Sequence, residues 1–136
     1  MVNKVKPLNQ YIKDLSFENF AAQKNEFESN KLDVHLDLNI KKKQLKNELI
    51  EITIVFFIEA TKLNEKKFII ELSYASTFLV DKTISALDKK RISFVECPNM
   101  MFPFVRQIIF NISRDSGFLP INLEPINFHE LYHSQK

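Results

Sequence analysis

Apolar and polar residues alternate over most of the first 80 positions, which is the pattern of β-strands that bury one face. The alternation is clearest over residues 48–60, where apolar side chains occupy every second position from Ile50 to Ile58. It also extends over residues 8–18, 34–40 and 68–79. Because strands that follow one another along a chain pair most simply in opposite directions, the pattern predicts a four-stranded antiparallel sheet.

The segments between these strands are polar. Residues 19–33 contain two isolated aromatic residues, Phe20 and Phe27, and are predicted to form a long crossover loop. Residues 41–46 are predicted to form a basic turn, and residues 61–67 a charged one. The sheet is therefore expected to occupy residues 8–80.

Helical periodicity replaces strand alternation beyond Asp81. Residues 82–90 are predicted to form a short polar helix or turn, and residues 97–114 a long helix with Pro98 in its first turn. An extended segment over residues 118–125 and a short helix over residues 126–133 complete the chain. We expect a single α+β domain over residues 1–136, with its helical part at 82–136.

The predicted long helix is apolar over more than one face. Such a helix is buried on more than one side, and a chain of 136 residues has little left to cover it twice. The pattern therefore favours an oligomer. The residues predicted for its interface are Met101, Phe102, Phe104, Val105, Ile108, Ile109 and Ile112.

The outward faces of the predicted strands are not uniformly polar. The polar positions of the last two strands are interrupted by Val55, Phe57, Ile69 and Leu79. Strict alternation places Ile12, Asp14 and Glu18 on one face of the first strand, and Glu71 on the polar face of the last. For the apolar residues, scattered surface positions and a subunit or partner interface both stay open. For the acids, a solvated sheet face and an acidic surface that docks a basic partner both stay open.

Composition excludes several classes of protein. The 19 Lys and Arg nearly balance the 17 Asp and Glu, which argues against a nucleic-acid binder. A single glycine, Gly117, excludes glycine-rich phosphate loops, and a single cysteine, Cys97, excludes an intramolecular disulfide. No apolar run approaches the roughly 20 residues of a membrane span, and residues 1–14 lack the apolar stretch of a signal peptide. We expect a cytoplasmic protein without direct membrane insertion.

One stretch, residues 129–133, matches the H-E-x-x-H pattern of zinc hydrolases. Only three residues follow it, so a solvated terminal helix that takes up metal adventitiously fits better than a catalytic centre. Cys97 lies near a helix start, but Glu96 beside it opposes thiolate formation. We therefore expect no enzyme activity, no cofactor and no functional metal.

Residues 96–106, with the sequence ECPNMMFPFVR, resemble a specific stretch of the SecB family of bacterial protein-export chaperones. Residues 11–18, YIKDLSFE, match the first strand of that family, and residues 68–72 resemble its last. Residues 117–120 and 125–132 match its C-terminal pattern. The resemblance thus covers nearly the whole chain in order.

This resemblance implies an ATP-independent holdase that keeps precursor proteins unfolded and delivers them to the SecA motor. It implies a sheet packed with a long and a short helix, assembled as a homotetramer, a dimer of dimers. The implied client-groove residues are Phe20, Phe27, Phe118, Leu119, Ile121 and Leu123. The implied SecA-docking residues are Asp14, Glu18, Ile69 and Glu71.

The chain also departs from the usual pattern of the family. Its pI is near 8.6, whereas members are typically acidic, so electrostatic steering toward SecA should be weaker. The usual Pro-rich segment after the first strand is replaced by residues 19–22. The alternatives are a SecB-like chaperone dedicated to another partner, such as a toxin–antitoxin system, a metallohydrolase, and an oligomer without clients.

Overall fold

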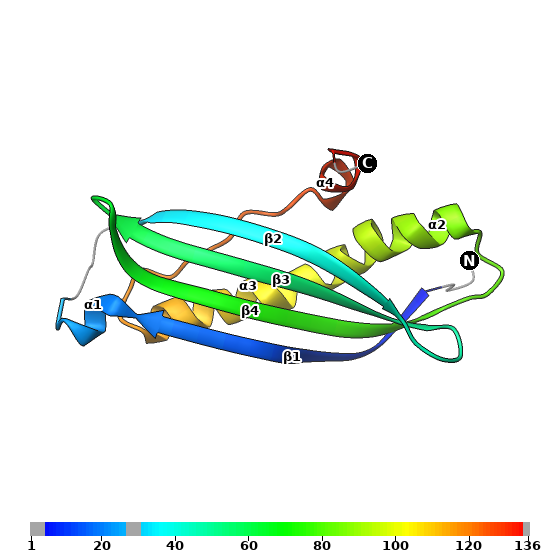
Figure 1. Cartoon of the computed structure of the whole chain (residues 1–136), viewed down its shortest axis with the longest axis horizontal. Helices are drawn as coiled ribbons and strands as arrows, with labels where there is room; N and C mark the ends of the chain where they lie inside the picture. Colours follow the sequence, from blue (N-terminus) through cyan, green and yellow to red (C-terminus); the bar gives the residue numbers. More distant parts are fainter. Residues whose placement is uncertain (1–4, 27–30, 135–136) are drawn as a thin grey trace.

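Four long antiparallel strands form one sheet in the computed structural model, which describes residues 5–26 and 31–134 (Figure 1). The strands are β1 (Val5–Asn19), β2 (Asp33–Gln44), β3 (Leu49–Lys62) and β4 (Glu65–Val80). Their order across the sheet is β1-β4-β3-β2, so the connection between β1 and β2 leads from one edge to the other. The predicted antiparallel sheet and its crossover are confirmed.

Strand β2 continues further than the sequence pattern predicts. Its pairing with β3 extends to Gln44 opposite Ile50, so most of the predicted basic turn is strand. The prediction is wrong there because Lys41 and Lys43 project to an open face of the sheet, where solvated lysines fit a strand as well as a turn. The actual turn occupies residues 45–48, and its Asn47 has a positive φ of 57° that Asn tolerates better than most residues.

The crossover contains a short helix, α1 (Phe20–Gln23), that the polar composition does not predict. The side chain of Asn19 caps it, because Oδ1 accepts a hydrogen bond from the Ala22 N–H at 2.9 Å. The same side chain donates through Nδ2 to the Ser116 carbonyl at 3.0 Å. The end of β1 is therefore fixed against the far end of the helical layer.

A continuous helical run lies along one face of the sheet and covers its middle (Figure 1). It consists of α2 (Ala86–Arg91), the π-helical turn η1 (Ile92–Glu96) and α3 (Cys97–Asp115). The sequence predicts no helix at 91–96. The π-helical turn η1 is wider than a turn of α-helix and comes just before Pro98. In a regular α-helix the ring of Pro98 would crowd the Phe94 carbonyl, and the wider turn relieves this contact. An irregular segment over 119–127 then leads to α4 (Phe128–Ser134), which confirms the short last helix.

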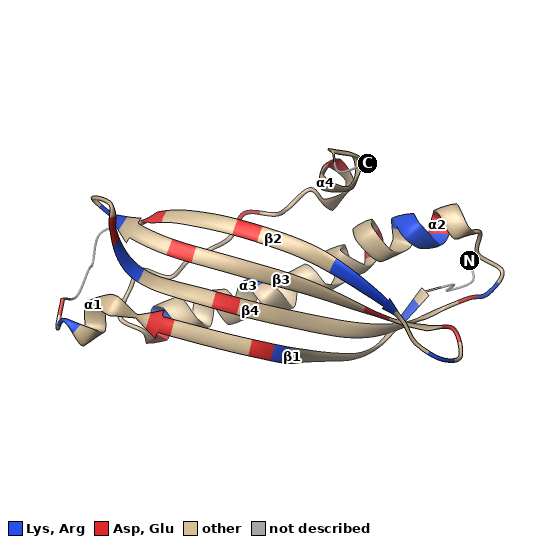
Figure 2. Ribbon diagram, in the orientation of Figure 1, with Lys and Arg blue, Asp and Glu red and all other residues tan. Residues whose placement is uncertain are grey.

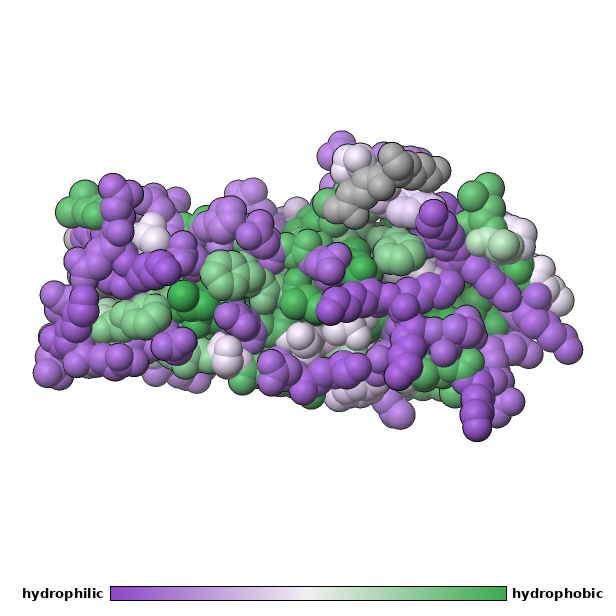
Figure 3. Space-filling view, viewed as in Figure 1, coloured by the Kyte–Doolittle hydropathy of each residue, from purple (hydrophilic) through white to green (hydrophobic). Residues whose placement is uncertain are grey.

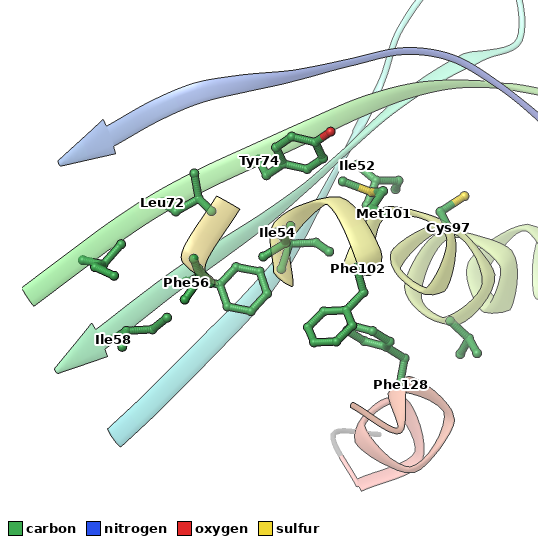
Figure 4. Close-up of a cluster of buried hydrophobic side chains, with 14 of the residues drawn as sticks. Ile52, Ile54, Phe56, Ile58, Leu72, Tyr74, Cys97, Met101, Phe102 and Phe128 are labelled. Carbon is green, nitrogen blue, oxygen red and sulfur yellow. The ribbon is translucent and has the colours of Figure 1, made fainter. Parts of the chain in front are cut away.

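The core lies between the inner face of the sheet and α3 (Figure 4). Phe56 of β3 packs near Phe102 of α3, with ring centroids 6.4 Å apart, and Phe102 lies 5.9 Å from Phe128 of α4. The fully buried side chains of the sheet include Ile52, Ile54, Phe56, Ile58, Phe68, Ile70, Leu72 and Phe78. One chain of aromatic contacts therefore joins the sheet, the long helix and the terminal helix.

This core corrects the predicted oligomer interface. Four of the assigned residues are no more than 6% exposed within a single chain: Met101, Phe102, Val105 and Ile109. Helical periodicity identifies which side chains of a helix are buried, but not whether the same chain or a second copy buries them. The sequence prediction therefore assigned the face of α3 that packs on the sheet to the oligomer interface. Phe104, which is 48% exposed, and the partly buried Ile108 and Ile112 remain as interface candidates.

Candidate functional site: two binding surfaces

The sheet face that the helices leave open carries acidic and apolar side chains next to each other. Glu18 of β1 lies opposite Ile69 of β4, and Ser16 lies opposite Glu71. Asp14 projects to the same face, two positions before Ser16. The three acids are exposed and Ile69 is half-buried. The structure thus brings the four residues implied for SecA docking onto one surface.

This surface continues onto β3 and β2. Phe57 lies opposite Glu71, Glu59 lies opposite Ile69, and Asp37 lies opposite Phe57. Figure 2 shows the acidic residues toward the α1 end of the sheet, and Figure 3 shows apolar patches enclosed by hydrophilic residues on this side. We call the following set the acidic face: Asp14, Glu18, Asp37, Phe57, Glu59, Ile69 and Glu71.

A register shift in β1 decides which of its side chains reach the acidic face. Ile12 lies opposite the buried Tyr74 and Asp14 opposite Ser73, so Lys13 is the extra residue of a β-bulge. Ile12 therefore faces the helical side of the sheet, whereas strict alternation puts it on the face of Asp14. That prediction is wrong, because a bulge changes the phase of a strand without leaving an obvious sequence signal.

A polar cluster holds this bulge in place. The Tyr11 hydroxyl donates to Glu51 Oε2 of β3, and Lys13 Nζ lies 3.0 Å from Glu51 Oε1. Hydrogen bonds from Tyr11 and Lys13 lower the pKa of Glu51, whose side chain is only 12% exposed. Burial, reinforced by the Glu51 carboxylate, raises the pKa of Tyr11 to about 12. At neutral pH a charged carboxylate therefore links β1 to β3 across β4.

An apolar groove lies between the edge strand β2 and the irregular segment that follows α3. Its volume is about 630 Å³. Its apolar lining consists of Leu32, Val34, Leu36, Phe68, Leu119, Pro120, Ile121, Leu123, Pro125 and Ile126. Lys31, Asp33 and Glu124 add charged groups to the lining. A space of this size and lining accepts several apolar side chains at once.

The structure places the predicted groove residues in different positions. Leu119, Ile121 and Leu123 are among the residues that line the groove. Phe118 is buried, with its ring centroid 4.6 Å from that of Phe68, and is not among the lining residues. Phe20 belongs to α1 and is not among the lining residues. Phe27 lies outside the described residues.

Sequence analysis misses the β2 wall of this groove. Val34 and Leu36 occupy the regular apolar face of a strand, which normally indicates core. Val34 is nevertheless 42% exposed, because β2 is an edge strand and the long helix packs over the middle of the sheet. Only the strand order, which pairs distant segments, identifies these residues as an open surface.

The structure describes the surroundings of both candidate catalytic groups, Cys97 and the H-E-x-x-H stretch at residues 129–133. Burial, with the nearby Glu96 carboxylate, raises the pKa of Cys97 to about 12, so the thiol stays protonated at neutral pH. Among residues 5–26 and 31–134, no three His, Cys, Asp or Glu side chains gather to hold a metal ion. The helices of the same residues are all too short or too polar to cross a membrane.

The chain belongs to the SecB family, because the model of that family, described as preprotein translocase subunit SecB, matches residues 2–136. The protein-export protein SecB of Dinoroseobacter shibae is 37% identical over 136 residues, with 96% of this chain and 77% of the relative covered. That of Orientia tsutsugamushi strain Boryong is 42% identical over 125 residues, covering 90% and 77%. The family consists of protein-export chaperones and not of enzymes.

The fold is also similar to a solved structure. A SecB-like chaperone of Mycobacterium tuberculosis, in complex with a ChAD peptide from an antitoxin, matches with a TM-score of 0.75. The match covers 90% of this chain and 91% of that one. At 8% sequence identity the similarity concerns the fold alone.

Replacing Glu51 tests the polar cluster that holds the bulge. Glu51→Gln should lower the free energy of unfolding by about 1 kcal/mol at neutral pH, because an amide accepts weaker hydrogen bonds than a carboxylate. Folding lowers the pKa of Glu51 below its usual 4.5. Its contribution is therefore complete above pH 4.5 and is lost as the pH falls through the folded-state value.

Urea unfolding of both proteins at neutral pH and near pH 3 measures this difference. Asp14→Asn, at an exposed position of the same strand, is the matched control and should change unfolding little at either pH. An effect of Glu51→Gln that is absent at neutral pH, or equally large in acid, would contradict the assignment.

Proposed function

We propose that this chain is an ATP-independent holdase of the cytoplasm, which binds unfolded precursor proteins and delivers them to the SecA motor. The observation that carries the proposal is the open apolar groove beside β2. A folded protein without clients would gain free energy by covering these side chains. Their exposure is consistent with a surface that is kept for another chain.

The groove suits chains that have no common sequence. Each client side chain of the size of Leu or Phe that it buries contributes roughly 1.5–3 kcal/mol, whatever its neighbours are. In the described sheet β2 has a strand on only one side, so its other edge is free to pair with an extended client backbone. Apolar side chains and backbone together provide affinity without a motif, and client folding competes with binding.

The acidic face is proposed to dock SecA. Its acids surround the half-buried Ile69 and Phe57, which is the arrangement of a polar rim around an apolar centre. It lies on the opposite side of the sheet from the core and the helices. A partner can therefore bind there while a client occupies the groove.

We further propose a homotetramer, a dimer of dimers. Apolar side chains remain exposed on the helical side of β1, where Ile12 is 45% and Leu15 is 39% exposed, and on α3 at Phe104. Packing of a second copy would cover them. Several grooves in one assembly raise affinity for a long client, because each further contact forms at high effective concentration.

A chaperone dedicated to one partner, such as a toxin–antitoxin pair, is the alternative function. The solved structure in complex with an antitoxin peptide shares only the fold, whereas relatives at 33–42% identity are protein-export proteins. The acids of the acidic face also support the export role.

Leu119 provides the test of client binding. Leu119→Asp should weaken binding of an unfolded precursor about fivefold or more, because a carboxylate would replace apolar contact in the groove. The residue is already 52% exposed, so the fold should tolerate the change. Leu87→Asp on α2, at a site 70% exposed and outside the groove, is the matched control.

Titration of a fluorescently labelled, reduced precursor measures both affinities, and circular dichroism checks that both variants fold. Equal affinities of the two variants would contradict the groove assignment. A loss confined to Leu119→Asp would support it.

Glu71 provides the test of SecA docking. Glu71→Lys should weaken SecA binding about tenfold at low salt while client affinity is retained, because the change reverses a charge within the acidic face. The effect should shrink in high salt, since Glu71 is exposed and its interactions are screened. Asp88→Lys makes the same charge change on α2, away from this face, and serves as the control.

Surface plasmon resonance with immobilised SecA gives these affinities. Unchanged SecA binding by Glu71→Lys at low salt would contradict the proposed docking surface. Loss of binding in both variants would show that net charge, and not this surface, controls the interaction.

A further inference from the structure

Two histidine rings converge on one exposed face of α4. His129 and His133 are four residues apart, so they lie one above the other on the helix. Their Nε2 atoms are 3.2 Å apart and their ring centroids 4.3 Å apart, with the ring planes inclined by 63°. The two Nε2 atoms therefore lie within hydrogen-bond distance of each other on the exposed side of α4.

The separation of the two nitrogens matches the geometry of a chelate. Zn²⁺ binds histidine nitrogen at about 2.0–2.1 Å in a tetrahedral arrangement, which places two ligating nitrogens about 3.3–3.4 Å apart. The observed 3.2 Å lies close to that distance. We propose that His129 and His133 together bind one Zn²⁺ ion through both Nε2 atoms, with water in the remaining positions.

The helix that carries the pair is anchored to the rest of the fold. Phe128 is 1% exposed and packs edge-on against Phe102 of α3. The ring of Tyr132 stacks on Phe94 of η1, at 6.2 Å and 7°. The Asn127 side chain accepts the Glu130 N–H at 3.0 Å, which caps the first turn. These contacts hold the backbone of the pair, so the two rings need little reorganisation to bind.

The pair provides two protein ligands, fewer than the three of a catalytic zinc site or the four of a structural one, so it would hold a hydrated ion at the surface. Both imidazoles are exposed, so an ion reaches them from solvent and keeps its water. The described part of the chain brings no third His, Cys, Asp or Glu to the pair. An imidazole pair favours Zn²⁺, Cu²⁺ or Ni²⁺ over Mg²⁺ and Ca²⁺, which prefer oxygen ligands.

Binding of the ion stabilises α4. The two nitrogens hold this separation only while the helix is formed, so the ion binds the helical state selectively and stabilises it by mass action. Ile126, which lines the groove, lies two residues before α4. The ion would thereby restrain the end of one groove wall, and this consequence does not depend on the identity of any client.

Calorimetric titration of the metal-free chain with ZnCl₂ tests the site. We expect one ion per chain with micromolar affinity, and no binding of MgCl₂ under the same conditions. His129→Gln and His133→Gln should each weaken Zn²⁺ binding at least tenfold, since Gln favours the helix but removes the ligand. His35→Gln is the matched control, because His35 lies on β2 with Asp37 as its partner at 3.0 Å.

Hydrogen exchange provides a second measurement. Zn²⁺ should slow amide exchange within residues 128–134 of the unmodified chain and should have no such effect in either α4 variant. Undiminished Zn²⁺ binding in both α4 variants, equal loss in His35→Gln, or a stoichiometry of one ion per two chains would each overturn the proposed site. Loss confined to the two α4 variants would support it.

Discussion

The four-stranded sheet has strands of up to 16 residues and therefore two large faces. The described helices cover only part of one face. Helix α3 spans 19 residues, or about 28 Å at the usual rise, and packs along the central strands β3 and β4. Among the described residues, the outer face has no covering layer, and part of the inner side of each edge strand is exposed, at Ile12 and Leu15 of β1 and at Val34 of β2. This shortage of covering structure produces each surface to which we assign a role.

The same constraint explains how one small fold carries two surfaces of different chemical character. The groove at β2 is apolar because its residues continue the core-facing pattern of the sheet beyond the reach of α3. The acidic face is mixed because it lies on the solvent side, where charged residues alternate with single apolar ones. In the proposed function, the groove would select unfolded chains by general hydrophobicity, and the acidic face would select a partner by charge and shape.

Local patterns predicted much of this structure. Alternation located the four strands, and it placed Glu71 and Ile69 on the outward face because period two holds along β4. Helical periodicity located α3. The sequence pattern failed where a residue's position depends on distant segments of the chain. The bulge at Lys13 is set by the pairing of β1 with β4. The burial of Met101 is set by the packing of α3 on the sheet. The exposure of Val34 follows from the position of β2 at the edge of the sheet, and a short stretch of sequence carries no information on strand order.

The central claim is that this chain assembles and holds unfolded proteins. Light scattering on a sizing column, with the protein alone and with a slow-folding precursor, tests it most directly. The account predicts a mass of four chains that co-elutes with the unfolded precursor and ignores the same precursor once it has folded. A single chain that never co-elutes with the unfolded precursor would contradict it.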